Sequence, residues 1–396
     1  MPTAQLDFGT NIAGWWREVK EDFWGDVKQE TLKLVKLLLE ESMTEELVTY
    51  TQAEWHERTA QRVSARNGFY ERTLSTELGC LDALRVPRSR DGRFRSAVLP
   101  RYQRRQPTVN GLLRDVFLAG VSTRRVGEVV QPVLGVRWSA TTVSTVTKAL
   151  DAAVHQYQRR SLPDEYQVLV LDGVTMKVKD ALGVKTRLVL VAYGLTAFGR
   201  RELLSFRQAA SESQACWEAF LNDLFRRGLE GTPLTLVVTD GGKGLHAALA
   251  VVYPYVKRQR CWAHKLRNVA ATLPRTIQAP CLKEAKTIYP APTRREAVAR
   301  FHQWERHWQR LAPKAVACLR ADLDELLTVL DFPVAQRVKL RTTNVIERCF
   351  REVRRRTRPI GCFTNAASCD RIIYAVFHRL NTGWQDRPLR EFTQFT

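Results

Sequence analysis

The chain has 396 residues, 44% of them hydrophobic, with 62 lysines and arginines against 41 aspartates and glutamates. It is too long for one average domain, and the formal net charge of +21 predicts a polyanionic partner, nucleic acid before an acidic membrane surface. A ribosomal or scaffold protein would share this charge, but no apolar run approaches the ~18 residues of a membrane span and no signal-peptide pattern is visible, so we expect no membrane partner.

The first patterned segment, roughly residues 15–48, carries apolar residues at helical spacing. Downstream, Asp91-Gly92 is a strong hairpin-turn signal flanked by arginines on both sides. We therefore assign residues 1–105 to an N-terminal helical region with a basic β-hairpin, which would either lie along a nucleic-acid backbone or be a solvated edge hairpin. The candidate DNA contacts in it are Arg88, Arg90 and Arg93.

Residues 106–160 predict three helices, at about 109–119, 122–134 and 139–157. Gly135 would turn the chain before a helix whose first turn is rich in serine and threonine. This pattern is typical of a helix-turn-helix DNA-binding domain, and a small helical bundle without DNA contacts is the alternative. The candidate groove or phosphate contacts are Ser139, Thr141 and Thr142.

From residue 161 the pattern changes to apolar strands that alternate with helices. The predicted strands are 167–172, 187–195, 202–209, 233–240 and 256–261. Three consecutive strands followed by alternating helices and strands indicate an α/β domain with a mixed sheet. We assign residues 161–263 to the first part of this core, 264–340 to a helical insertion, and 341–396 to the last part with the C-terminal tail.

Two aspartates, Asp172 and Asp240, each follow an apolar strand and precede a glycine. Functional groups gather at strand ends in open α/β sheets, and the glycine lets a backbone or phosphate approach. A lone aspartate in this position is usually a turn former or helix cap. Two matching Asp-Gly contexts favour a shared functional site.

Glu347 is a third carboxylate, at the head of a predicted helix that is crowded with arginines. Helical spacing places it on one face with Arg351 and Arg354. The modest interpretation is a surface pair with Arg351 that contributes only ~0.2–0.5 kcal/mol. The sharper one is that three converging carboxylates bind Mg²⁺, and that two ions ~3.5–4 Å apart act on a phosphodiester whose backbone the arginines hold.

Two smaller motifs lie between these carboxylates. Lys243 in DGGKGL lacks the spacing of a nucleotide-binding phosphate loop, and a backbone-phosphate contact is our interpretation. Cys261 and His264 form C-x-x-H, but no second pair completes a zinc site. The eight cysteines are irregularly spaced and form no C-x-x-C, which is typical of reduced thiols in a cytosolic compartment.

Taken in order, the motifs DGVTMKV, TDGGKGL, QRCWAHKLRN and TTNVIER…RRRTR resemble those of the Mutator-type DDE transposases of bacterial insertion sequences. GVSTRRV and RNGFYERTL extend the resemblance to roughly residues 45–380. It implies a ribonuclease-H-like core, a helical insertion before the last catalytic helix, and Asp172, Asp240 and Glu347 as the catalytic, metal-binding triad. Cys261 and His264 match the family's C-x-x-H signature, which is structural or near the active site.

The implied activity is cleavage at terminal inverted repeats followed by strand transfer to new DNA. We expect two Mg²⁺ ions per site, with Mn²⁺ as a substitute, double-stranded DNA as partner, and a homodimer or larger synaptic assembly. The expected location is the bacterial cytoplasm, at the nucleoid when DNA is bound. The expected DNA contacts around the catalytic motifs are Lys177, Lys243, Lys265, Arg267, Asn344, Arg351, Arg354, Arg355 and Arg356.

Two other functions fit the same residues. A metal-dependent structure-specific nuclease on the same fold would hydrolyse DNA without joining it. A DNA-binding regulator would carry the carboxylates as relics or surface pairs, so that Glu347→Gln would leave its activity intact.

Overall fold

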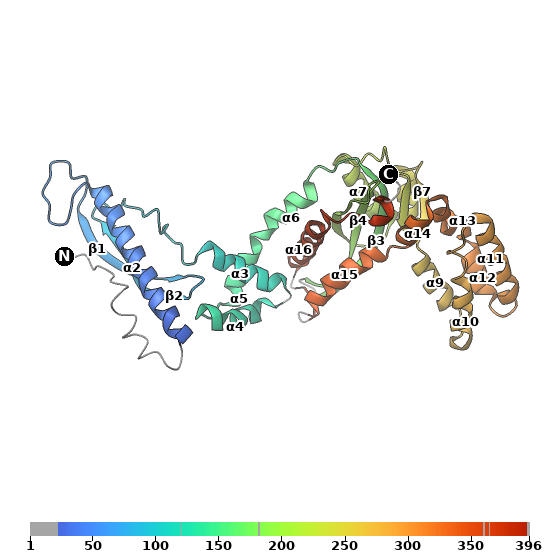
Figure 1. Ribbon diagram of the computed structural model, residues 1–396, viewed down its shortest axis with the longest axis horizontal. Coiled ribbons are helices and arrows are strands. Elements are labelled where there is room, and N and C mark those ends of the chain that lie inside the picture. Colours follow the sequence, from blue (N-terminus) through green and yellow to red (C-terminus); the bar gives the residue numbers. More distant parts are fainter. Residues whose placement is uncertain (1–22, 120, 181–182, 359–360, 364, 394–396) are drawn as a thin grey trace. The chain divides into compact units, whose positions relative to one another are not determined.

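The computed structural model contains two compact units, one formed by Met1–Lys148 and the other by Ala149–Thr396 (Figure 1). The structure describes residues 23–119, 121–180, 183–358, 361–363 and 365–393. Among the helices of these residues, none is long and apolar enough to span a membrane.

In the first unit, the helix α2 (Phe23–Thr51) packs against the antiparallel pair β1 (Arg66–Ser75) and β2 (Cys80–Ser89). Met43 of the helix and Leu84 of the second strand are fully buried in the small core between them. The amphipathic helix predicted for this region is confirmed from Phe23 onward, and its earlier part, residues 15–22, lies outside the described residues.

The hairpin turn predicted at Asp91-Gly92 is wrong. A turn exists there, since the Gly92 amide donates to Ser89 O over 3.1 Å, but it follows the second strand of a hairpin already closed by residues 76–79. The Asp91 carboxylate explains the difference, because it accepts hydrogen bonds from Tyr50 Oη at 2.6 Å and from the Arg93 amide at 3.1 Å. These contacts tie the turn to α2, so no third strand follows it.

Three short helices complete the first unit: α3 (Pro107–Leu118), α4 (Thr123–Leu134) and α5 (Ala140–Lys148). Gly135 ends α4 in the left-handed conformation with φ 69°, as the turn prediction requires. Gly127 in α4 has no room for a side chain, because a Cβ there would lie 2.0 Å from Trp138 O. That close approach brings the turn before α5 against α4.

The helix predicted over residues 139–157 is in fact two helices. The first, α5, ends at Lys148, and α6 (Leu150–Arg159) begins after Ala149 and belongs to the second unit. The sequence offers no glycine or proline at this point, and Ala149 itself keeps helical backbone angles, with φ −58° and ψ −21°, so the interruption is one residue long.

The second unit is built on a five-stranded sheet with the order β5-β4-β3-β6-β7. Its strands are β3 (Tyr166–Asp180), β4 (Gly183–Thr196), β5 (Arg201–Ala209), β6 (Leu236–Thr239) and β7 (Lys257–Arg260). The first three pair antiparallel as a meander, whereas β6 pairs with β3, and β7 with β6, in parallel. The predicted α/β class with a mixed sheet is therefore confirmed.

Alternation along β3 assigns its side chains to two opposite faces of the sheet. Leu169 and Leu171 belong to the core beneath α7 (Gln214–Arg226) and α8 (Lys243–Val252). Val168, Val170 and Asp172 therefore face the other side. That side carries α15 (Asn344–Thr357) and α16 (Ala366–Trp384), both in contact with β3.

The segment between β7 and α15 is helical, as its pattern predicts. It contains α9 (Trp262–Ala271), α10 (Arg275–Ala285), α11 (Arg294–Trp308), α12 (Pro313–Arg320), α13 (Leu323–Leu327) and α14 (Val334–Leu340). Phe301, Trp304 and Trp308 of α11 are buried, which the spacing of its apolar residues predicts. A last short helix, α17 (Arg390–Thr393), follows α16.

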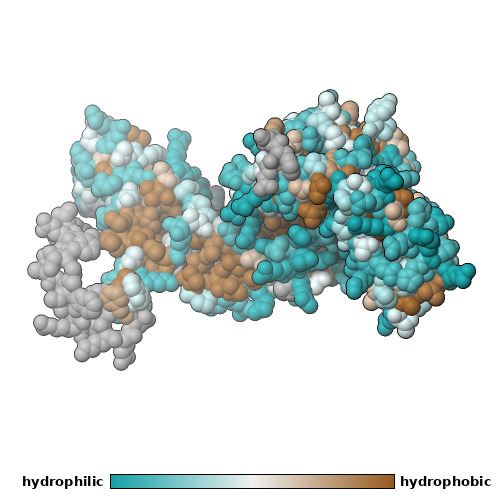
Figure 2. Space-filling model, turned by 45° about the vertical axis from the view of Figure 1, so that its right-hand side comes forward, coloured by the Kyte–Doolittle hydropathy of each residue, from teal (hydrophilic) through white to brown (hydrophobic). Residues whose placement is uncertain are grey.

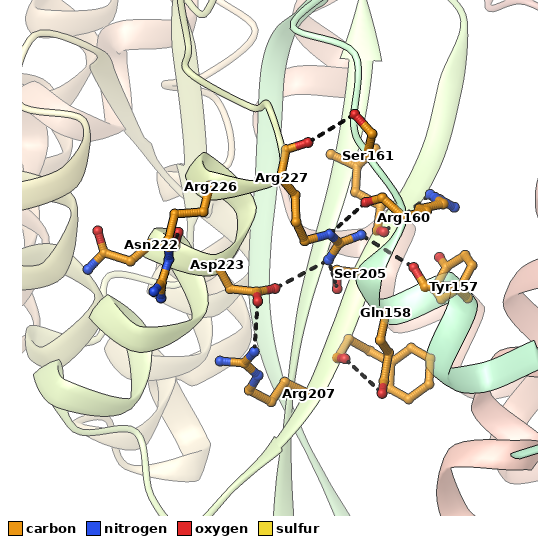
Figure 3. A network of polar contacts seen from close by, with 12 residues as sticks. Tyr157, Gln158, Arg160, Ser161, Ser205, Arg207, Asn222, Asp223, Arg226 and Arg227 are labelled. Atoms are coloured by element: carbon orange, nitrogen blue, oxygen red, sulfur yellow. Dashed lines mark hydrogen bonds and ion pairs between the residues drawn. The ribbon is translucent and has the colours of Figure 1, made fainter. Parts of the chain in front are cut away.

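Arg227 ties α6, β5 and α7 together (Figure 3). Its guanidinium donates to Arg160 O at 2.9 Å, Ser205 Oγ at 3.0 Å, and both Tyr157 O and Asp223 Oδ2 at 3.3 Å. The side chain is only 8% exposed. Such a group is costly to bury, and the four acceptors offset that cost.

We predict that Arg227→Ala lowers the free energy of unfolding by about 3 kcal/mol, because acceptors in a half-buried site lose their donor. The matched control is Arg226→Ala, since exposed Arg226 bonds only to Asn222 O of its own helix, at 3.2 Å. It should change stability by less than about 0.5 kcal/mol. Urea denaturation measures both, and equal losses would contradict the prediction.

Candidate active site

The pairing of β3 with β6 aligns Asp172 with Asp240. Val168 pairs with Leu236, and Val170 with Val238, in parallel register. Two residues further along, the same register places Asp172 opposite Asp240. Neighbouring strands of a sheet lie about 4.8 Å apart. Asp172 does not end its strand as predicted, because β3 continues to Asp180. It lies instead just past the last pair that β3 makes with β6.

Asp172 is only 4% exposed. Burial raises its pKa to about 7, and the charge of Asp240 adds to the rise, while His264 and a hydrogen bond from Thr343 oppose it. Its Oδ1 also accepts the Gly173 amide at 2.9 Å. A buried carboxylate of this kind is held for a cation or a proton.

Glu347 lies in the first turn of α15, on the sheet face of Asp172. Arg267 from α9 reaches it with Nη2, at 2.8 Å from Oε1 and 3.1 Å from Oε2. His264 Nε2 lies 3.6 Å from the same Oε1. The partner of Glu347 in this structure is therefore a cation from α9, and not Arg351 of its own helix.

Cys261 and His264 join the start of α9 to the start of α15 through Thr343. The Thr343 amide donates to Cys261 Sγ over 3.3 Å, and Thr343 Oγ1 lies 3.4 Å from His264 Nδ1. Hydrogen bonding with Cys261 raises the pKa of His264, with burial in opposition. Burial works against a Cys261 thiolate, but bonds with His264 and Thr343 lower its pKa overall. These contacts position His264 beside Asp172 and Glu347.

A cleft of about 390 Å³ gathers these groups. Asp172, His264, Arg267 and Glu347 line it. Arg351 and Arg354 also line it, and among the described residues neither side chain has a hydrogen-bond or ion-pair partner. The arrangement is a pair of carboxylates in a pocket of free positive charge, which suits a phosphate group.

Across the described residues, no three or more His, Cys, Asp or Glu side chains form a group that could hold a metal ion as they stand. The donor chemistry nevertheless fits Mg²⁺, because Asp172, Asp240 and Glu347 offer only hard carboxylate oxygens. Glu347 is not oriented as a metal ligand in this structure, because both of its carboxylate oxygens face Arg267.

Two of the expected DNA contacts are structural residues instead. Lys265 is 3% exposed and its ammonium pairs with Asp322, so it is not available to DNA. Arg356 has a side chain that is 13% exposed, and it donates to Glu352 Oε2 at 2.8 Å. Asp322 ties α9 to the start of α13, and Glu352 holds Arg356 against α15 itself.

The other expected contacts of the second unit lie on the surface. Lys177 lines a hollow of about 320 Å³ with Arg354, next to the cleft. Lys243 is exposed at the start of α8, directly after the Asp240 loop. Asn344 is half-buried at the start of α15, and the side chain of Arg355 is 80% exposed.

In the first unit, the expected contacts lie on two surfaces. Arg88 and Arg90 line a hollow of about 880 Å³ between the hairpin and the segment after it, and Arg93 is exposed beside it. That hollow is rich in cations and tyrosines: Tyr70, Arg72, Arg95, Arg101, Tyr102 and Arg104. Ser139 accepts the Thr142 amide over 3.1 Å at the start of α5, and Thr141 is exposed there.

Sequence reasoning missed Glu212 and Thr343. A Cβ on Gly173 would lie 3.0 Å from Glu212 Oε1, so this carboxylate lies against the backbone next to Asp172. Burial and the charge of Asp240 raise the pKa of Glu212. No spacing in the sequence signals this residue, because it comes from the loop after β5. Thr343 lies inside the TTNVIER motif, directly before α15, so the sequence marked its segment without assigning the residue a role.

Residues 17–387 match the family described as "Transposase, Mutator family", a range that includes all three carboxylates. The chain is 34% identical over 354 residues to the transposase for insertion sequence element ISRM5 of Rhizobium meliloti, covering 89% of this chain and 88% of the relative. It is 35% identical over 367 residues to the transposase for IS256 in transposon Tn4001 of Staphylococcus aureus, with 91% of each covered. The transposase for IS905 of Lactococcus lactis is 32% identical over 331 residues.

We predict that Asp172→Asn raises the free energy of unfolding of the metal-free protein at pH 8 by about 2–4 kcal/mol. The folded-state pKa of Asp172 is raised to about 7, so the folded chain keeps a proton that the unfolded chain loses above about pH 4. The free energy of unfolding of the wild type therefore falls as the pH rises from about 4 to about 7. That of Asp172→Asn does not fall in this range, because asparagine carries no titrating proton.

Denaturation with a chelator at pH 4 and pH 8 measures the difference. The gain should be small at pH 4, where both side chains are neutral. The control is Asp386→Asn, because Asp386 is exposed. A gain that is equal at both pH values would contradict the prediction.

Proposed function

The chain belongs to the Mutator family of transposases, and we propose that it binds the terminal inverted repeats of its insertion sequence, cuts the DNA there and joins the 3′ end to new DNA. The observation that carries the proposal is the alignment of Asp172 with Asp240, beside a cleft that Asp172 lines together with Glu347 and with two arginines, Arg351 and Arg354, whose side chains have no partner among the described residues. This is the donor set and charge that phosphodiester chemistry needs.

The strand order supports a ribonuclease-H-like core for this chemistry. Three antiparallel strands followed by two parallel ones, with helices on both faces, place the first and fourth strands side by side. The first two carboxylates of the proposed triad come from these strands. The third comes from the helix after the insertion, which lies on the same face.

Asp172, Asp240 and Glu347 would hold two Mg²⁺ ions, with Mn²⁺ as a substitute. Bound metal activates the attacking water or 3′-hydroxyl and stabilises the leaving oxygen. Glu347 has to leave Arg267 to become a ligand, and a DNA phosphate offers Arg267 a replacement partner. His264 would keep Glu347 near the cleft during this exchange.

Arg351 and Arg354 would hold the DNA backbone next to the scissile phosphate, since both line the cleft without a partner among the described residues. Lys177 would extend this contact along the neighbouring hollow. Lys243, exposed after the Asp240 loop, would add another phosphate contact. Each such contact adds sequence-independent, salt-dependent affinity.

The first unit would recognise the element ends. Helices α4 and α5, joined by the turn at Gly135, resemble a helix-turn-helix, and the exposed Ser139 and Thr141 stand at the start of its second helix. The arginine-lined hollow beside β2 would take backbone phosphates.

Synapsis of two ends requires at least a dimer. Apolar side chains gather on the face of the first unit seen in Figure 2, whereas the second unit is mainly hydrophilic in that view. Among the described residues of the first unit, Leu38 of α2 is 55% exposed and Val133 of α4 is 56% exposed. Apolar surface of this kind marks protein interfaces, and we propose it for contact between copies.

We predict that Glu347→Gln lowers metal-dependent cleavage and joining at least about a hundredfold, because a ligand of the proposed metal site is lost. DNA affinity should stay within about threefold, since phosphate contacts set it. The assay uses DNA carrying the flanking repeats, with Mg²⁺ or EDTA.

The matched control is Glu352→Gln, on the same helix but paired with Arg356 outside the cleft. It should retain activity. Cleavage without joining in the wild type would favour a nuclease, and chemistry that survives Glu347→Gln would overturn the triad.

We also predict that Arg354→Ala weakens DNA binding at all sequences and reduces the slope of log affinity against log salt by about 0.9, the value of one phosphate contact. Arg226→Ala should leave the slope unchanged, because Arg226 is on α7, on the opposite face of the sheet. Fluorescence anisotropy at several salt concentrations measures both slopes. A slope unchanged by Arg354→Ala would remove this residue from the interface.

A further inference from the structure

A second cavity, of about 550 Å³, lies on the same face of the sheet as the catalytic cleft. Val168 and Val170 of β3 form its floor, together with Tyr193 of β4, and α9 and α15 contribute walls. These strand residues precede Asp172 on the same face. The volume is that of a small-molecule or cofactor site.

The charge around this cavity has one sign. Six of its lining residues are cations: Arg201, Arg267, Lys286, Lys339, Arg341 and Arg348. Among the described residues that line it, none is acidic. A cavity with this lining selects an anion over a neutral apolar ligand.

Several of these cations lack a partner. Lys286 and Arg348 are exposed at the rim, and within the described chain neither side chain has a hydrogen bond or ion pair. Arg201 Nε is fully buried without a hydrogen-bond partner. An unsatisfied buried donor is costly and calls for a bound acceptor.

The interior is aromatic as well as apolar. Trp262 and Tyr289 both line it, with ring centroids 5.2 Å apart, and Arg341 stacks over Tyr289 at 4.4 Å. Trp262 Nε1 is already satisfied by Leu326 O at 2.8 Å. Trp262 is only 1% exposed and supports Tyr289 from beneath, so the accessible ring is that of Tyr289, which with the Arg341 guanidinium suits a flat group that binds by stacking.

Arg267 lines both this cavity and the catalytic cleft, and Asn344 and Arg348 bring the first turn of α15 to the cavity, next to Glu347. We propose that the cavity receives one nucleotide unstacked from the DNA beside the scissile phosphate, its base against Tyr289 and Arg341 and its phosphate at the cationic rim. This rests on the proposed function, because it requires DNA in the cleft.

A nucleotide meets each feature of the cavity. Its base is flat and stacks, and its phosphate is an anion that Lys286 and Arg348 can reach at the rim. Enzymes that act on a duplex take nucleotides out of the stack into such pockets, and a gap next to the cut would let the strand bend into the cleft. An apolar segment of a second copy would fill the interior but leave the rim cations and Arg201 Nε unpaired.

The test places 2-aminopurine, one position at a time, within about five nucleotides of the junction between the repeat and the flanking DNA, because this base brightens when unstacked. Wild-type protein should raise the fluorescence severalfold at one position. Tyr289→Leu and Lys286→Gln should lose most of that rise. The matched controls are Tyr255→Leu, at a tyrosine that is 98% exposed, and Lys283→Gln, on the exposed surface of α10; both should keep it.

Cleavage gives a second readout. Tyr289→Leu should cut intact DNA about tenfold more slowly, and an abasic site at the bright position should restore its rate, because no base then has to be unstacked. A variant that was merely misfolded would not be rescued in this way.

Three outcomes would overturn the proposal. If the wild type cuts the DNA with no bright position, the cavity does not take a nucleotide and the transposase function stands. If Tyr289→Leu changes the oligomeric state in sedimentation and not the fluorescence, the occupant is a second copy. If the wild type neither binds nor cuts the DNA, the proposed function fails and the cavity assignment with it.

Discussion

The parallel pairing of β3 with β6 is the constraint on which the site depends. Both strands are apolar and buried, so a slip of one residue would exchange the faces of every side chain and expose the core. Hydrophobic burial therefore fixes the register, and the register sets Asp172 level with Asp240. The functional geometry follows from packing that involves no functional residue. The antiparallel pairing of β3 with β4 continues past Asp172 to Asp180. Asp172 therefore lies within the sheet and not at the end of its strand.

Burial of Asp172 disfavours its ionised form, and the surrounding charges compensate for this only in part. The carboxylate is 4% exposed, and the positive charge that opposes the rise in its pKa is that of His264, whose own pKa is raised mainly by its hydrogen bond with Cys261. The arginines of the cleft do not neutralise it, because Arg267 pairs with Glu347, and the side chains of Arg351 and Arg354 line the cleft without a partner in the part of the chain that the structure describes. The carboxylate of Asp172 on β3 and the guanidinium groups of Arg351 and Arg354 on α15 thus line the same cleft without neutralising one another. A metal ion and a phosphate would neutralise both together.

Much of this could be predicted from the sequence, because apolar periodicity and Asp-Gly punctuation are local signals. They locate all five strands of the sheet and the carboxylates Asp172, Asp240 and Glu347. The same local signals fail where tertiary contacts decide. Asp91-Gly92 is a turn held by Tyr50, and β3 runs through Asp172-Gly173 because β4 pairs with it there. Lys265 looks like a surface cation until the fold brings Asp322 to it from another helix.

The same reasoning explains why net charge alone does not identify the DNA-binding residues. On α15, Arg351 and Arg354 lie toward the cleft while Arg356 turns to Glu352, so the arginines of one helix divide between binding and stability. The division follows from helix geometry together with the position of a single glutamate on the flank. Arg267 stands between these two roles. It holds Glu347 while lining both cavities, so DNA that takes Arg267 as a partner also frees the carboxylate that the proposed metal site needs. Substrate binding and assembly of the catalytic site are then a single electrostatic exchange.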